Sequence, residues 1–235
     1  MHAQKQEGLS YIGVPVHLGL ISGDQMIAVA DLAERYGGDI RLTRQQNFIV
    51  TGIPTGAVEE AQADIERIGF RLDVNPLRGN SIACTGEPHC NFSVAETKTR
   101  LGRLIDRLEE RFGTQIAELR LHLDGCPHSC AQHWVADLGF QGTTARDEDG
   151  ARRQAYDIFL RGGLGPAPAI GRSLFRRVPT EELDGAVAGL VGGWLERRAP
   201  GEGFTAFARR ASDEELGELA GLEPARTRQR EEDEE

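Results

Sequence analysis

The chain has 235 residues, of which 39% are hydrophobic and 27% are charged, and its formal net charge is −10. These values are typical of a globular protein long enough for one or two domains, each with a core of its own. The acidic balance argues against nucleic acid as a partner, and no apolar run approaches the ~20 residues of a membrane span. The N-terminus lacks the apolar core of a secretory signal, so we expect a cytoplasmic protein.

Residues 8–75 predict a small α/β unit. Strands are expected at residues 11–16, 39–43 and 47–50. Ser22 and Gln25 have the spacing of a capping box, and Gly37 follows where the helix should end. The expected buried face of this helix consists of Met26, Val29, Leu32 and Ala33. The breaker stretch 52–56 then leads to a second helix that ends at Gly69.

The turn-rich stretch 75–80 predicts a boundary, with a second domain at residues 80–215. A long helix is expected at residues 92–112 and a strand at residues 116–123. The expected buried stripe of the helix consists of Val94, Leu101, Leu104, Ile105, Leu108 and Phe112.

Two further strands are predicted at residues 134–140 and 154–160, around a polar loop at 143–152. The glycine-rich stretch 161–165 lacks the full phosphate-loop pattern, which argues against nucleotide binding. A helix is expected from Thr180, followed by a closing helical segment at 204–208. The helix should bury Leu183, Val187, Leu190, Val191 and Trp194. The mostly charged residues 221–235 predict a disordered tail.

The four cysteines form two pairs, Cys84 with Cys90 and Cys126 with Cys130. Four thiolates are what a cubane iron–sulfur cluster requires, because each iron takes one external sulfur ligand. Zinc knuckles favour shorter spacings than the first pair has, and disulfides need an oxidising compartment. A cluster is therefore the leading interpretation, with zinc and disulfides as alternatives.

Residues 83–98 and 123–133 resemble the sirohaem and [4Fe-4S] segment of the nitrite and sulfite reductase family. The similarity rests on both cysteine spacings, the Cys-Pro-x-x-Cys turn and the run Ala-Glu-Thr-Lys after the first pair, and it extends over residues 8–215. It implies an α+β fold, with a ferredoxin-like half-domain followed by an α/β domain that binds sirohaem and the cluster. It also implies that all four cysteines ligate a [4Fe-4S] cluster and that Cys130 bridges it to sirohaem iron.

Arginines and amides gather between the two strands predicted at 39–43 and 47–50. Sirohaem carries eight carboxylates, and fixed donors of this kind suit its rim. The resemblance implies that this loop contacts sirohaem through Arg41, Arg44, Gln46 and Asn47, with the two amides better placed. The alternative is a solvated edge strand.

The helix expected to begin just after Cys90 would place its dipole and free N–H groups at the cluster. Lys98 and Arg100 on this helix are candidates to reach a carboxylate or the substrate, although a solvated helix face is the commoner role. Three histidines lie near the cysteines, namely His89, His128 and His133. All three are candidates to donate a hydrogen bond to cluster sulfur or to sirohaem carboxylates, and His128 is the best of them. The alternative for His133 is that it begins a surface helix and only packs.

The resemblance implies the six-electron reduction of nitrite to ammonia or of sulfite to sulfide, with electrons from a donor such as ferredoxin. It covers only the second of the two halves that such enzymes carry, so we expect a homodimer or heterodimer in which a partner supplies the missing half. Two alternatives stay open: a non-catalytic iron–sulfur module for electron transfer or redox sensing, and a protein similar to precorrin-3B synthase of cobalamin synthesis.

Overall fold

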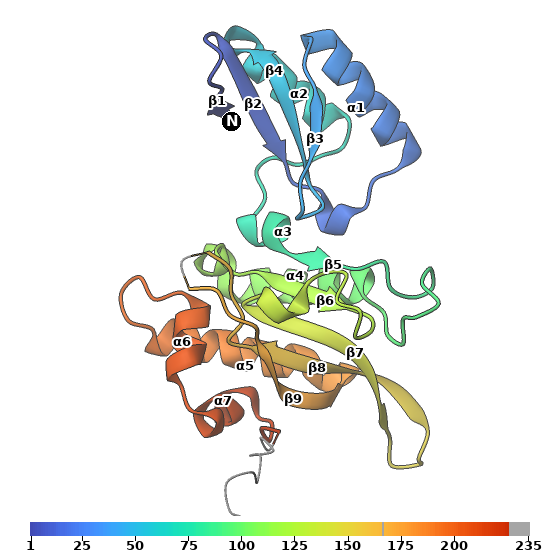
Figure 1. The fold of residues 1–235 in the computed structure, drawn as a ribbon, viewed down its shortest axis with the longest axis vertical. Helices are drawn as coiled ribbons and strands as arrows, with labels where there is room; N and C mark the ends of the chain where they lie inside the picture. The colour runs from blue at the N-terminus through green and yellow to red at the C-terminus, as the bar shows by residue number, and fades with distance from the viewer. Residues whose placement is uncertain (166, 226–235) are drawn as a thin grey trace, which may run out of the picture. The chain divides into compact units, whose positions relative to one another are not determined.

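The computed structural model describes residues 1–165 and 167–225, which form two compact units (Figure 1). The first unit contains Met1–Ala83 and Glu109–Arg120, and the second contains Cys84–Leu108 and the chain from Leu121 onward. The change of unit at Cys84 lies a few residues beyond the expected start of the second domain at residue 80. The chain crosses between the units more than once, since residues 109–120 belong to the first unit again.

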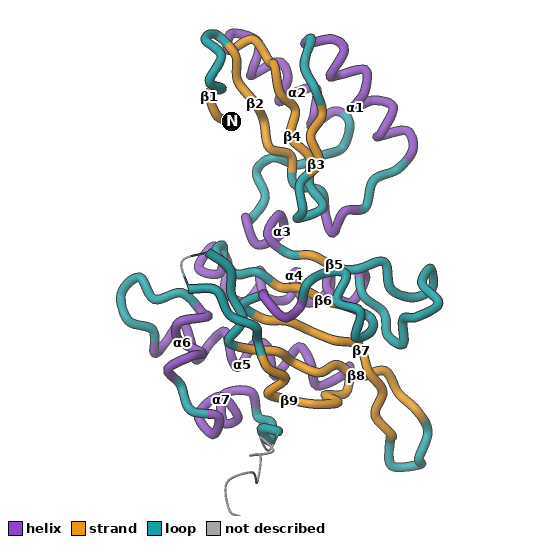
Figure 2. The backbone as a smooth tube through the Cα atoms, viewed as in Figure 1, coloured by secondary structure: helices purple, strands orange, loops and turns teal. Residues whose placement is uncertain are grey.

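The first unit is a four-stranded antiparallel sheet covered by two helices. Its strand order is β1-β2-β4-β3. The strands are β1 (His2–Ala3), β2 (Leu9–Val14), β3 (Ile40–Leu42) and β4 (Phe48–Pro54). The helices α1 (Gly23–Tyr36) and α2 (Val58–Arg67) pack against each other and against β4 (Figure 2). The core between sheet and helices is formed by Ile12, Val14, Val16, Val29, Leu32, Phe48, Val50, Ile53, Val58, Ala61, Ile65 and Phe70.

The expected start and end of α1 are confirmed. The hydroxyl of Ser22 accepts from the N–H of Gln25 at 3.1 Å, the Gln25 amide reaches back to the Ser22 N–H, and Gly37 takes the left-handed conformation that ends the helix. The expected burial of Met26 is wrong, because its side chain is 59% exposed. β4 also runs further than predicted, through Gly52 to Pro54, since β2 pairs with it along that length.

The stretch predicted as a turn at residues 75–80 forms a short helix, α3 (Pro76–Asn80), followed by β5 (Ile82–Ala83). The side chain of Asn75 caps this helix by accepting from the N–H of Leu77 at 3.1 Å, and proline occupies its first position. Single-turn 3-10 helices complete the unit at His17–Gly19, Thr55–Ala57 and Gly113–Ile116.

The second unit contains a sheet in which β6 (Leu121–Asp124) runs parallel to β7 (Leu138–Arg146). β8 (Arg152–Leu160) and β9 (Arg172–Pro179) continue it in antiparallel fashion. The loop expected at residues 143–152 is mostly hairpin, because β7 and β8 stay paired as far as Arg146 and Arg152. β9 was not predicted from the sequence.

Three helices complete this unit: α5 (Thr180–Arg197), α6 (Phe204–Arg210) and α7 (Asp213–Ala220). α5 packs against β8, β9, α6 and α7, and its predicted buried stripe is confirmed. The predicted tail is wrong for its first residues, since the N–H of Leu222 donates to Gly217 and that of Ala225 to Leu174. Residues 226–235 lie outside the described residues. Among the described residues, no helix has the length and apolar character needed to cross a bilayer.

The long helix α4 (Lys98–Phe112) begins six residues later than predicted. Val94, expected on its buried face, is 39% exposed, and Phe92, the expected first residue of the helix, is 68% exposed. The segment before the helix is held by other contacts, because the N–H of Val94 donates to the Gly125 carbonyl at 2.9 Å and the Tyr156 hydroxyl donates to the Glu96 carbonyl at 2.6 Å. The expected helix N-terminus next to Cys90 is therefore absent.

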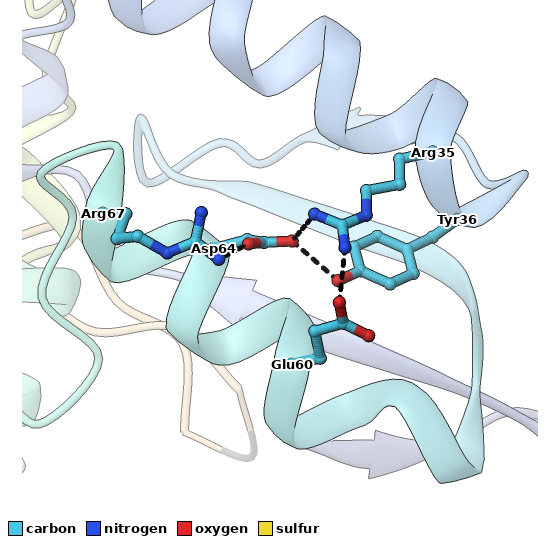
Figure 3. Close-up of polar contacts among 5 residues, drawn as sticks. All are labelled: Arg35, Tyr36, Glu60, Asp64 and Arg67. Carbon is cyan, nitrogen blue, oxygen red and sulfur yellow. Dashed lines mark hydrogen bonds and ion pairs between the residues drawn. The ribbon is translucent and has the colours of Figure 1, made fainter.

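A buried carboxylate ties α1 to α2 in the first unit (Figure 3). Asp64 is 4% exposed and accepts from Arg35 Nη1 at 2.8 Å and from the Tyr36 hydroxyl at 2.7 Å, while Arg67 pairs with its other oxygen. Glu60 also pairs with Arg35, but both of these side chains are more than half exposed. Burial makes Asp64 the energetically important member of the cluster.

We expect Asp64→Ala to lower the free energy of unfolding by about 2–3 kcal/mol, since it leaves Tyr36 and Arg35 without their buried acceptor. Glu60→Ala, the matched control, should cost less than about 1 kcal/mol because its ion pair is exposed to solvent. Urea unfolding followed by far-ultraviolet circular dichroism measures both. Equal losses for the two variants would contradict the assigned role of Asp64.

Candidate functional site

The four cysteines lie on two loops of the second unit that meet at the end of β6. The N–H of Cys84 donates to the Leu123 carbonyl at 3.0 Å, and the N–H of Gly125 donates to Cys84 Sγ at 3.2 Å. Cys126 and Cys130 follow directly on the chain that leaves β6. These bonds hold the loop of the first pair against the origin of the loop that carries the second.

Close packing between the loops requires glycine at two positions. A Cβ on Gly125 would lie 1.9 Å from Ser93 Oγ, and one on Gly86, whose φ is +66°, would lie 2.0 Å from Thr97 Oγ1. Thr97 in turn donates to the Cys84 carbonyl at 2.8 Å. Any larger side chain at either glycine would push the loops apart.

All four cysteines are free thiols, and they differ in exposure. Cys84 and Cys126 are buried, Cys90 is half-buried and Cys130 is exposed. The solvent exposure of the cysteines therefore increases from Cys84 and Cys126 through Cys90 to Cys130.

The thiols lie in an environment that disfavours negative charge. Burial raises the pKa of the Cys84 thiol, although the Gly125 N–H opposes the shift. Burial raises the pKa of the Cys130 thiol too, and the charges of Asp124, Cys126 and Cys90 add to the effect. Four thiolates here would repel one another, so a cationic group between them would be strongly stabilised.

The four thiols fit the donor set of a [4Fe-4S] cluster. In the described part of the chain, no group of three or more His, Cys, Asp or Glu side chains is placed to hold one metal ion. Four unpaired thiols on two adjoining loops match the donor chemistry of a [4Fe-4S] cluster, which is larger than one ion and uses one sulfur per iron.

The buried carboxylate of Asp124, at the end of β6, organises the second cysteine loop. It accepts from the N–H of Ala131 at 2.7 Å and from the N–H of His133 at 3.3 Å, and His133 Nδ1 lies 2.8 Å from it. These bonds close the chain segment that carries Cys126 and Cys130. The sequence analysis did not single out Asp124, although an acidic residue ending an apolar strand signals a buried, bonded carboxylate.

The alternative of a surface position for His133 is wrong, because the residue is fully buried. Its ring packs edge-on against Trp134 and Phe159, and its Nε2 has no hydrogen-bond partner. His128, by contrast, is exposed, with Nδ1 3.6 Å from Cys126 Sγ and its ring against Phe92. His89 is exposed on the first cysteine loop.

The two cations considered on α4 differ in their surroundings. Arg100 is 6% exposed and forms an ion pair with Asp184, which also pairs with Arg107. Arg100 therefore joins α4 to α5 and is not available to a substrate. Lys98 begins the helix; burial lowers its pKa, and the charge of Cys84 opposes this shift.

The predicted sirohaem-contacting loop forms the β3–β4 turn of the first unit. Both groups of the Asn47 amide are occupied, because Oδ1 accepts from the Val16 N–H at 2.9 Å and Nδ2 donates to the Gly79 carbonyl at 2.7 Å. Gln46 donates to the Ala83 carbonyl at 3.0 Å, and its buried Oε1 has no partner. Arg41 and Arg44 are exposed and form no ion pair within the described residues. The guanidinium groups of the arginines are thus available to an anionic ligand. The two amides, which the resemblance favoured, are bonded within the first unit.

We expect Asp124→Ala to destabilise the cluster-free protein by about 3 kcal/mol, since it removes three bonds and leaves His133 buried without its partner. Asp124→Asn should cost less, because its oxygen still accepts from Ala131. Guanidinium unfolding and hydrogen exchange at the Ala131 amide report both effects. The exposed hairpin residue Asp149 supplies the control, Asp149→Ala, and an Asp124→Ala protein as stable as this control would disprove the assignment.

Known proteins resemble this chain over most of its length. Residues 2–68 match the nitrite/sulfite reductase ferredoxin-like half domain. The chain is 37% identical over 217 residues to sulfite reductase [ferredoxin] 1 of Mycolicibacterium paratuberculosis, covering 90% of this chain and 39% of that protein. It is 33% identical over 227 residues to the assimilatory ferredoxin-dependent nitrite reductase of Haloferax mediterranei, covering 95% of this chain and 38% of that protein.

Solved structures agree with the sequence comparisons. The NirA protein of Mycobacterium tuberculosis superposes with a TM-score of 0.82 at 32% identity, over 90% of this chain and 40% of that one. A dissimilatory sulfite reductase I shares the fold, with a TM-score of 0.68 at 13% identity. The chain spans about two fifths of the length of the curated relatives named above. The predicted fold, with its ferredoxin-like half domain, is confirmed. The chain belongs to the nitrite/sulfite reductase family.

Proposed function

We propose that this chain is the sirohaem- and [4Fe-4S]-binding part of an oxidoreductase that reduces nitrite to ammonia or sulfite to sulfide. The observation that carries the proposal is the joining of two cysteine loops at the end of β6, where the Gly125 N–H donates to Cys84 Sγ at 3.2 Å. Four free thiols on these loops and relatives named as sulfite and nitrite reductases support the same assignment.

Cys84, Cys90, Cys126 and Cys130 would hold the cluster. Its iron would offset the desolvation and the negative charges of Asp124, Cys126 and Cys90 that raise the pKa of the Cys130 thiol. The Gly125 N–H would donate to the Cys84 thiolate, and His128 lies within reach of Cys126 Sγ. Hydrogen bonds of this kind to cluster sulfur raise the reduction potential. Free thiols that ligate a cluster must stay reduced, and the cytoplasm that we propose as the location is a reducing compartment.

Cys130 is the proposed bridge to sirohaem, because it is the most exposed of the four thiols. Arg41 and Arg44 are the proposed partners of sirohaem carboxylates, since both guanidinium groups are exposed and unpaired within the described residues. When bound, sirohaem would supply the redox-active iron that the reduction of a small anion needs.

Other residues of the second unit position the four thiols. Asp124 holds the turn from Cys126 to Cys130 by three hydrogen bonds, so the outer thiol keeps a defined place. Gly86 and Gly125 let the loops approach closely, which keeps the buried thiol Cys84 away from solvent. The choice between nitrite and sulfite would depend on the residues that bind the anion.

A non-catalytic iron–sulfur module is the second candidate. It is favoured by the four free thiols on loops of the second unit, which supply a complete ligand set for a cluster by themselves. Such a module would use the same four thiols for the cluster but would leave Arg41 and Arg44 without a ligand. Sirohaem binding therefore separates the two functions.

The absorption spectrum of protein purified without oxygen, from a host that makes sirohaem, tests the proposal. We expect a Soret band with a red sirohaem band, together with iron and sulfide near four each per chain for the cluster. A broad iron–sulfur shoulder without haem bands would instead support the non-catalytic module. A protein that binds neither group would refute both.

Cys130→Ser should remove the electronic coupling between cluster and haem and abolish anion reduction with an artificial donor. Ser129→Ala alters the neighbouring residue of the same turn without removing a thiol, so it serves as the control and should keep the spectrum. Full turnover by Cys130→Ser would refute the bridging role.

We also propose that the chain pairs with a second segment, from another copy or another polypeptide, and draws its electrons from a ferredoxin-type donor. β3 lies at the edge of the first sheet and exposes 86% of Leu42, so this edge can accept a further strand. Light scattering of the cofactor-loaded protein should give a dimer, and Leu42→Lys should shift it towards monomer. A monomeric parent protein would contradict pairing with a second copy.

A further inference from the structure

A shallow groove of about 540 Å³ lies on the second unit between the β7–β8 hairpin and β9, and we call it the arginine groove. It is lined by Thr144, Ala145, Arg146, Arg152 and Arg177. All three arginines are exposed, and none of the described residues that line the groove is acidic. Such a concentration of positive charge is unusual on a chain whose formal net charge is −10.

Two of these arginines face each other across the hairpin. Arg146 and Arg152 are direct cross-strand partners, and like charges at such positions destabilise a sheet. Their guanidinium groups donate to neutral oxygens, Arg146 to the Gly150 carbonyl at 2.7 Å and Arg152 to the Thr144 hydroxyl at 3.2 Å. In the described part of the chain neither forms an ion pair. The repulsion between them is thus left for an external anion to relieve.

Arg177 reaches the groove through an irregularity in β9. Its φ is +53°, an unfavourable value for a residue with a side chain, and the register of β8 and β9 shifts beside it. The Arg177 N–H donates to Asp157 Oδ1 at 2.7 Å, which holds this conformation. Bulges of this kind redirect a side chain, here a third guanidinium towards the same groove.

The acidic residues nearby do not neutralise the groove. Asp147 is engaged by Arg153, with Nε 2.7 Å from Oδ2, and this contact lowers the pKa of Asp147. Glu148 and Asp149 at the hairpin tip are exposed and do not line the groove. Asp157, which accepts from the Arg177 N–H, and Glu87, which accepts from Gln154, also lie near the groove without lining it. The groove therefore keeps three arginines that form no ion pair within the described residues, with the acidic side chains at its margin.

The groove is next to the first cysteine loop. Thr144 pairs with Gln154 across the hairpin, two residues before Arg146 pairs with Arg152, so these four side chains share one face of the sheet. Gln154 Nε2 donates to Glu87 Oε2 at 2.8 Å, and Gln154 Oε1 accepts from the Glu96 N–H at 3.1 Å. Glu87 lies between Cys84 and Cys90, so its bond to Gln154 joins the hairpin directly to the cysteine loop. Arg152 is two residues from Gln154, or about 7 Å along the strand.

We propose that the arginine groove docks an acidic electron-donor protein beside the cluster loop. This inference rests on the proposed function, which requires a one-electron donor. A protein surface fits better than a small anion, because the three guanidinium groups are exposed on separate strands and do not converge in a buried pocket. Local positive charge at this face would overcome the repulsion between an acidic donor and an acidic chain.

Binding of the full chain, loaded with its cofactors, to an immobilised acidic [2Fe-2S] ferredoxin tests the proposal. Surface plasmon resonance at low and high salt should show affinity that falls as salt rises. The triple variant Arg146→Ala, Arg152→Ala, Arg177→Ala should bind about tenfold more weakly or worse, with most of the loss in the association rate. It should fold as the parent does, since it removes like-charge repulsion and no buried contact.

Two further variants set the direction of the effect. Arg71→Ala, Arg103→Ala and Arg111→Ala together remove three exposed arginines outside the groove and should leave affinity within about twofold of the parent. Glu148→Gln with Asp149→Asn removes the marginal acids and should tighten binding. Equal losses in the two arginine triples would overturn the proposal, because they would reflect net charge alone. So would groove-dependent binding of inorganic phosphate without binding of ferredoxin.

Turnover with reduced methyl viologen separates this proposal from the proposed function. Turnover that is unchanged in the groove triple, together with lost ferredoxin binding, supports docking at the groove. Viologen-driven turnover with groove-independent ferredoxin binding overturns the docking surface alone. Groove-dependent ferredoxin binding by a chain without turnover supports the docking surface and overturns only the reductase function.

Discussion

The buried carboxylate of Asp124 is the contact on which the arrangement of the site depends. It ends β6, the strand that delivers the chain to the second cysteine pair, and it accepts from the backbone of Ala131 and from both the backbone and the ring of His133. A carboxylate taken out of water is costly unless its oxygens are satisfied, so the surrounding chain must adopt the one conformation that satisfies them. That conformation is the turn that carries Cys126 and Cys130. The first cysteine loop then joins the same strand end through Cys84 and the Gly125 N–H.

Charge explains how the rest of the site is disposed. Burial and nearby negative charge raise the pKa of thiols that a cluster would need as thiolates, so the apo arrangement favours a cationic group at its centre. The potential anion contacts lie elsewhere, with Arg41 and Arg44 on the β3–β4 turn and three arginines in the groove beside the cysteine loop. The proposed anion contacts are thus local positive charges on an acidic chain, since these arginines form no ion pair within the described residues whereas Arg100 is held in one.

Much of the fold was readable from local patterns. The capping box at Ser22 and the buried stripe of α5 are confirmed, since each depends on residues a few positions apart. Predictions failed where contacts distant in sequence decide the conformation. Residues 92–97 have the apolar spacing of a helix, but the Gly125 carbonyl and the Tyr156 hydroxyl hold them outside α4. The polar stretch 143–152 looked like a loop, yet strand pairing extends through most of it because backbone hydrogen bonds do not require apolar side chains.

The sequence by itself determined the cysteine pairs, the family resemblance and the kind of cofactor to expect, because ligand chemistry depends on residue type and spacing. Only the tertiary structure decided the roles of the residues around them. His133 is buried against Asp124 rather than on a surface helix, Asn47 has its amide committed to Val16 and Gly79, and the arginine groove forms from three strands. Burial and the pairing of polar groups are properties of the whole packed chain. A single residue type cannot reveal whether its partners are solvent, a neighbouring loop or a ligand.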